Sequence, residues 1–114
     1  MLRVDSDILT IYPGETVGHI TGHLSCALII PADFPVGNIK SLETKQVITY
    51  GMSGQSTLTV SSILEQDAIV ALQREIVNIN GRRIGRQEFK RAQGKSVENL
   101  LAETARQIVT GQLG

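Results

Sequence analysis

The chain has 114 residues, of which 41% are hydrophobic and 19% charged, so we expect one globular domain over residues 1–114. Its 11 basic and 11 acidic residues cancel, which argues against attraction to nucleic acid or to an anionic membrane. Its single cysteine excludes an internal disulfide. No apolar run approaches the roughly 20 residues that cross a bilayer, and the N-terminus does not resemble a secretory signal. We therefore predict a cytoplasmic protein with no membrane partner.

The first elements are predicted from short apolar runs and the residues that end them. Ile8–Tyr12 is followed by a Pro-Gly pair, which is typical of a strand and a turn. Residues 15–25 stay open between a short helix and a glycine-rich loop. Their apolar residues have helical spacing, whereas Gly18 and Gly22 disfavour a helix.

Residues 27–50 are predicted to form a strand, a short helix and a second strand. Ala27–Ile30 is a continuous apolar run, typical of a strand covered on both faces. Asp33 stands before a proline as a helix cap, and residues 36–43 have apolar side chains at helical spacing. Val47–Tyr50 forms the next strand. Such a unit usually places its two strands side by side and parallel.

An antiparallel hairpin is predicted in the second half of the chain. Asn80-Gly81 lies between alternating segments, and both residues tolerate positive φ. Residues 68–79 and 82–92 are therefore expected to pair, with residues 57–63 beside them. The alternative is a helix over residues 68–77, because that segment contains good helix formers.

A C-terminal helix follows the hairpin. Ser96 is a suitable N-cap, the apolar side chains after it form one stripe, and Gly111 is a natural stop. The predicted fold class is therefore α/β. It is a mixed sheet with a parallel strand–helix–strand unit, an antiparallel hairpin and a C-terminal helix packed on the sheet.

Three short motifs occur in the order found in a known enzyme family. They are Ala32-Asp33-Phe34-Pro35, Thr49-Tyr50-Gly51 and Asn99-Leu100-Leu101-Ala102. With them, residues 27–111 resemble the second half of the central domain of Mur ligases, the ATP-dependent amide ligases of peptidoglycan precursor synthesis, and their folylpolyglutamate-synthase relatives. The resemblance implies a bacterial protein connected with cell-wall precursor metabolism.

The chain departs from that family where ATP would be held. Gly94-Lys95-Ser96 is its only Gly-Lys-Ser/Thr tripeptide, and it lacks the glycine that precedes it in a phosphate-binding loop. We interpret it as a turn followed by a helix cap. We therefore expect no catalytic residue and no cofactor. The predicted function is a non-catalytic binding or assembly module that forms a homo-oligomer or joins a protein partner.

Polar residues after the two parallel strands define the predicted ligand site. Asp33 follows the first strand, and Gly51, Ser53, Gly54 and Ser56 follow the second. Ligand sites of α/β sheets lie at the carboxyl ends of parallel strands, so these residues are expected to lie together. The serine-rich segment could present backbone amides to an anion. The alternative is a plain turn between strands.

Two histidines and the cysteine define a candidate metal site. His19, His23 and Cys26 would share one face of a helix, and such a face could bind Zn²⁺. The corresponding alternative function is a small metal- or phosphate-ligand-dependent enzyme that uses His19, His23 and the strand ends near Asp33 and Gly51. The His-x-x-x-His spacing echoes the ligase family, but its acidic partners are absent. The other interpretation is a glycine-rich surface segment with incidental histidines.

Positive charge is concentrated in the predicted hairpin, at Arg82, Arg83, Arg86, Lys90 and Arg91. Such a patch could bind phosphate or nucleic acid, which gives a third hypothesis, a nucleic-acid accessory module. Only one aromatic residue is interleaved for stacking on bases. We therefore favour a solvated face and expect no nucleic-acid partner.

Overall fold

The computed structural model describes residues 2–94 and 96–114, and it is 49% strand and 14% helix. The elements are β1 (Leu2–Thr10), β2 (Ile20–Pro31), the 3-10 turn η1 (Val36–Asn38), β3 (Ile39–Tyr50), β4 (Leu58–Ile63), β5 (Asp67–Leu72), β6 (Ile76–Val77), β7 (Arg83–Ile84), β8 (Gln87–Ala92) and α1 (Val97–Val109). One sheet has the order β1-β2-β3-β4-β5-β8, and β6 pairs with β7 separately. Lys95 of the Gly-Lys-Ser motif lies outside the described residues.

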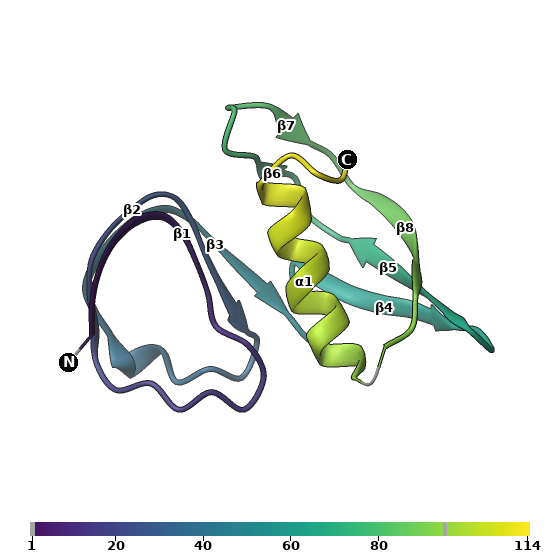
Figure 1. Ribbon diagram of the computed structural model, residues 1–114, viewed down its shortest axis with the longest axis horizontal. Coiled ribbons are helices and arrows are strands. Elements are labelled where there is room, and N and C mark those ends of the chain that lie inside the picture. The colour runs from purple at the N-terminus through teal and green to yellow at the C-terminus, as the bar shows by residue number, and fades with distance from the viewer. Residues whose placement is uncertain (1, 95) are drawn as a thin grey trace.

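Strands β1, β2 and β3 are parallel and bend together into an arch, which we call the coil (Figure 1). Leu2 pairs with Ile20, which in turn pairs with Ile39, so the three strands lie side by side in the order β1, β2, β3. The concave side of the arch encloses a hydrophobic cluster, the coil core. Its buried members are Ile11, Ile20, Leu24, Leu28, Ile30 and Phe34.

Two backbone positions show how the strands depart from regular extended geometry. Gly22 has φ 125°, and a Cβ there would lie 1.9 Å from the carbonyl oxygen of Val4. Only glycine therefore fits where β1 lies against β2. Ser41 has φ 58°, and β3 carries an extra residue between Ile39 and Leu42 relative to β2. Such bulges bend and twist a strand, which fits the curvature of the coil.

The predicted helix over residues 36–43 is wrong. Only Val36–Asn38 form a 3-10 turn, and β3 begins at Ile39. Ile39 and Leu42 both pack against the coil core, because the bulge at Ser41 interrupts the strand alternation. An irregular strand thus produced the helical spacing. The predicted α/β fold class is also wrong, because the protein is mostly β and has a curled mixed sheet.

Residues 20–25 are neither a helix nor a glycine-rich loop, because they belong to β2. Ile20 and Leu24 are buried in the coil core, and Gly22 stands between them against the backbone of β1. A strand that alternates Ile, Gly and Leu on its inner face has apolar residues four apart, as a helix does. The spacing alone therefore did not separate the two structures.

Helix α1 packs on the convex side of β2 and β3 and on the neighbouring β4 and β5 (Figure 1). This second cluster, the helix core, is formed largely by alternate residues of the strands and one stripe of α1. Its buried members are Cys26, Ala27, Ile29, Ile48, Tyr50, Leu58, Val70, Leu72, Ile76, Ile84, Leu101, Ala102, Ala105, Ile108 and Val109.

Several predictions of local structure are confirmed. Ala27–Ile30 is buried on both faces, and β2 and β3 are parallel neighbours. The Asn80-Gly81 hairpin forms, since β5 pairs with β8 and β6 with β7, and β4 lies antiparallel beside β5. The alternative helix over residues 68–77 does not form. The Asn99 amide donates to Ser96 Oγ at 3.2 Å, which is the predicted cap of α1.

Candidate functional site

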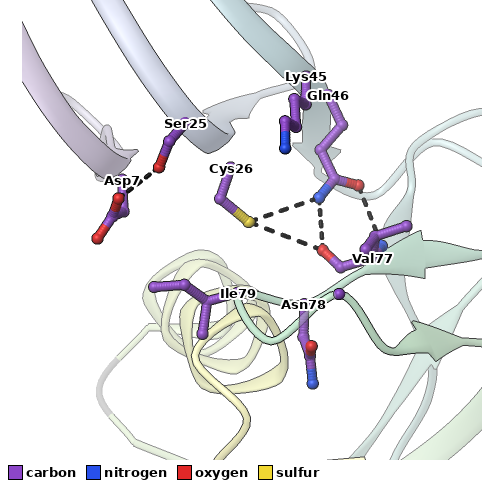
Figure 2. A pocket seen from close by; sticks show the side chains of 9 residues that line it. Asp7, Ser25, Cys26, Lys45, Gln46, Val77, Asn78 and Ile79 are labelled. Carbon is purple, nitrogen blue, oxygen red and sulfur yellow. Dashed lines mark hydrogen bonds between the residues drawn. The ribbon is translucent and has the colours of Figure 1, made fainter.

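A pocket of about 610 Å³ lies between the coil and the turn that joins β6 to β7 (Figure 2). We call it the junction pocket. Its volume is within the range of about 300–1,000 Å³ that is typical of small-molecule sites. The residues that line it are Asp7, Ser25, Cys26, Lys45, Gln46, Val77, Asn78, Ile79 and Gly81.

All three strands of the coil contribute polar side chains to the wall of this pocket. Asp7 comes from β1, Ser25 from β2 and Lys45 from β3. Ser25 Oγ donates a hydrogen bond to Asp7 Oδ1, which fixes the carboxylate toward the middle strand. An acidic and a basic group therefore line the same pocket, with a hydroxyl on the strand between them.

Gln46 joins the coil to the hairpin at the edge of the pocket. Its Nε2 donates to the carbonyl oxygen of Val77 at 2.5 Å, and the Val77 amide donates to its Oε1 at 3.2 Å (Figure 2). The side-chain amide thus pairs with both backbone groups of Val77, as a neighbouring strand would. This double contact holds β6 against β3 and gives the pocket a defined width.

Cys26 lies behind this contact and is only 7% exposed. Its Sγ is 3.8 Å from the carbonyl oxygen of Val77 and 3.9 Å from Gln46 Nε2. Burial raises the pKa of the thiol, so the protonated form is favoured at neutral pH. The thiolate is the nucleophilic form of cysteine. The arrangement therefore suits a neutral wall better than a nucleophile.

The opposite wall is built by the turn after β6. Asn78 is buried, and its Oδ1 accepts hydrogen bonds from the amides of Asn80 at 2.9 Å and Arg82 at 3.0 Å. The amide of Ile79 donates to the carbonyl of Val109, at the end of α1. These contacts fix the turn on the helix, so both walls of the pocket have defined supports.

The predicted ligand residues come together at a different place. Asp33, Gly51 and Ser53 line a pocket of about 260 Å³ at the ends of β2 and β3. Asp33, Ser53 and Ser56 also line a shallower hollow of about 520 Å³, together with Arg74. Asp33, Gly51 and Ser53 thus lie together at the carboxyl ends of the two parallel strands. Whether they bind a ligand stays a prediction.

The serine-rich segment there is closed by its own contacts. The Ser56 amide donates to the Ser53 carbonyl, and the Gln55 amide to Ser53 Oγ, both at 3.1 Å. The Oγ of Ser56 is buried with no hydrogen-bond partner within residues 2–94 and 96–114. Gly54 is not among the residues that line either hollow. This is the turn between strands that the sequence offered as the alternative.

The candidate metal residues do not share a helical face. His19 precedes β2, His23 is exposed on that strand, and Cys26 is buried further along it. The helix on which their spacing depended is absent from this part of the described chain. Among residues 2–94 and 96–114, no group of three or more His, Cys, Asp or Glu side chains is arranged to hold a metal ion.

The basic residues of the hairpin do not form one face. Arg83 pairs with Glu75 and Lys90 with Asp67, both at 3.6 Å. Lys90 and Arg91 are consecutive in β8, so their side chains point to opposite sides of the sheet. The nucleic-acid hypothesis therefore gains no continuous patch from the fold and stays a prediction.

Sequence reasoning missed most of the junction pocket, because its wall is assembled by pairing between strands that are distant in the chain. Asp7, Ser25 and Lys45 carry no motif, and the sequence indicated Cys26 and Asp7 only as possible metal ligands and Gly81 only as part of a turn. Comparison with protein-family models, with curated proteins and with solved structures found no match. Within the described residues, no helix is both long and apolar enough to cross a bilayer.

Proposed function

We propose that the protein is a non-catalytic cytoplasmic module that binds a small zwitterionic molecule in the junction pocket. The observation that supports this most directly is the presence of a carboxylate and an ammonium group in one pocket of ligand size. Asp7 would receive the ligand's ammonium group, and Lys45 would receive its carboxylate. Ser25, which already donates a hydrogen bond to Asp7, would orient the Asp7 carboxylate for its contact with the ligand's ammonium group.

The spacing of the strands limits the size of the ligand. Asp7 and Lys45 stand on β1 and β3, which are separated by β2, so their backbones lie about 10 Å apart. A flexible lysine side chain can shorten that span. Val77 and Ile79 would contact an apolar side chain of the ligand. A free amino acid or a short peptide meets these requirements.

The predicted resemblance to Mur ligases is not needed for this proposal. If the resemblance holds, amino acids and short peptides of cell-wall precursors would be the natural candidates. If it does not hold, the same chemistry would recognise other amino acids or peptides.

The single cysteine gives a direct test, because it lines the proposed pocket. The rate of Cys26 alkylation by iodoacetamide is measured at about pH 7, where the probes keep their ammonium groups, with incubation long enough for the slow reaction of a mostly protonated thiol. L-alanine, L-glutamate and the dipeptide Ala-Ala are the added probes. At least one of them is expected to slow alkylation, and Asp7→Asn or Lys45→Gln is expected to remove that protection.

Two controls separate binding from a general effect on stability. Lys40→Gln removes a lysine of β3 that does not line the pocket, so it should leave the protection unchanged. The melting temperature of each variant is measured in parallel. If none of the probes protects Cys26 at about 10 mM, well above the dissociation constants usual for metabolite sites, the proposal is wrong.

A further inference from the structure

The outermost strand, β1, has an open edge. In the part of the chain that the structure describes, β1 pairs with β2 and no strand lies on its other side. The Leu2 amide donates to the carbonyl of His19, so the backbone groups of Leu2 point toward β2. Backbone groups alternate along a strand, so those of Arg3 and Asp5 point toward the open edge. A nine-residue open edge is a template for a further strand.

The side chains along this edge alternate in charge and polarity. Arg3 and Asp5 are exposed on the convex side of the coil, and their side chains lie 3.0 Å apart. Val4, between them, packs against the coil core. Leu2 is 44% exposed. From Arg3 to Asp5 the edge therefore carries one positive charge, one negative charge and, between them, an apolar residue that faces the interior.

We propose that β1 pairs antiparallel with β1 of a second copy of this chain, about a twofold axis at Val4. This register places Arg3 opposite Asp5 of the second copy, and Asp5 opposite its Arg3. The backbone groups of Arg3 and Asp5 face the partner strand. The two cross-strand pairs are therefore hydrogen-bonded pairs, and each joins residues of opposite charge. The two Val4 side chains meet on the concave side, and the two coil cores become continuous.

Other ways of covering the edge fit the charges less well. A twofold axis at Asp5 would place the two Asp5 carboxylates opposite each other. A head-to-tail stack would use the open part of β3, whose pairing with β4 is confined to Tyr50 and Leu58. Asp5 is in register with His23, and His23 with Glu43, so this stack would place Asp5 of the next copy beside Glu43. The closed dimer avoids both contacts between like charges.

Sedimentation velocity tests the proposal through the two charged residues. The wild type is expected to dimerise with a Kd on the order of tens of micromolar, because the shared edge is short. R3D and D5R each place like charges opposite each other across the axis. Each is expected to raise the Kd about tenfold or more.

Mixing the two single variants is the decisive measurement. In the mixed pair, an edge with two acidic residues faces an edge with two basic residues, so a heterodimer is expected although each variant alone is monomeric. A gain of intramolecular stability cannot produce this result, because neither variant regains its own Arg3–Asp5 contact. R82D, which changes an exposed charge in the β6–β7 turn, should leave dimerisation unchanged.

Three results would overturn the inference. The first is a monomeric wild type at about 1 mM, far above the expected Kd. The second is a wild-type dimer whose Kd is the same in R3D, which would mean that another surface is used. The third is a mixture of R3D and D5R that stays monomeric while the wild type dimerises. None of these measurements involves the junction pocket, so they are independent of the proposed ligand.

Discussion

The coil core and the helix core share strands β2 and β3 but are enclosed in different ways. The coil core lies inside a bent sheet, so it depends on backbone positions that permit the bend, above all Gly22 and Ser41. The helix core lies between the other side of the same strands and the apolar stripe of α1. We therefore expect the stability of the coil core to depend on backbone conformation, and the stability of the helix core to depend on side-chain volume. The two can be separated experimentally by choosing substitutions of each kind.

The largest effect is expected from Gly22→Ala. The new Cβ would overlap the Val4 carbonyl, 1.9 Å away, at a φ that L-residues rarely adopt. Strain and overpacking together should lower the free energy of unfolding by about 4 kcal/mol. Urea denaturation measures the loss, and hydrogen exchange should show it first in β1 and β2. Gly18→Ala is the matched control, because nothing lies within 4 Å of a Cβ there. Equal effects of the two substitutions would contradict this account of the bend.

Leu101→Ala should act on the other core. Leu101 is fully buried in α1, so truncation leaves a cavity and should cost about 3 kcal/mol of the free energy of unfolding. Hydrogen exchange should increase in α1, β4 and β5 before it increases in β1. Leu64→Ala, at a residue that is 44% exposed, should change little. If β1 lost its protection as early as α1, the two cores would be one cooperative unit.

Gln46→Ala should loosen the connection between the coil and the hairpin. It removes both hydrogen bonds to Val77, each worth about 1 kcal/mol, so a loss near 2 kcal/mol is expected in urea denaturation. The exchange of the Val77 amide should become faster. Gln66→Ala, at an exposed glutamine between β4 and β5, serves as the control. An unchanged Val77 amide would mean that β6 is held mainly by β7.

The smallest effect is expected from Glu103→Gln, at a contact between the N-terminal region and α1. Glu103 accepts hydrogen bonds from Arg106 and from the Tyr12 hydroxyl, and these hold the pKa of its carboxyl below its ordinary value near 4.5. A carboxyl whose pKa falls on folding adds stability above its unfolded pKa and loses it as the pH falls through the folded value. Because both side chains of the ion pair are more than a third exposed, the difference at pH 7 should stay below about 1 kcal/mol.

The pH dependence provides the check on that last prediction. The stabilities of the wild type and Glu103→Gln are compared by urea denaturation from pH 7 downward. Their difference should be complete near pH 7 and should shrink below about pH 4.5, as Glu103 becomes protonated in the wild type. A difference that is constant over this range would show that charge on Glu103 does not stabilise the contact.

The two halves of the chain also differ in how far the sequence predicts them. Asn80-Gly81 and Ser96 act through neighbours a few residues away, so the hairpin and α1 were predicted correctly. The coil depends on pairing between strands that are far apart in the chain. Its bulges and Gly22 give apolar spacings that resemble helices, so local periodicity predicted a helix over residues 36–43 that does not form.

The candidate sites differ in the same way. Asp33 and Gly51 directly follow strands that were predicted to be parallel neighbours, so their meeting at one edge could be foreseen. Asp7, Ser25 and Lys45 meet only because three bent strands lie in register. None of these three residues belongs to a local motif that reveals which residue of the neighbouring strand it lies beside. A pocket of this kind becomes visible only with the fold.

Tyr50 has its ring in the helix core, and its hydroxyl donates to the carbonyl of Ile11 at 2.6 Å. Burial raises the pKa of this phenol far above its ordinary value, whereas the chain has no tryptophan and only one other tyrosine. Ultraviolet difference spectra in alkali should therefore show an immediate step from Tyr12 and a delayed step from Tyr50. The rate of the delayed step would report how fast the coil core and the helix core open around Tyr50, without any added dye or label.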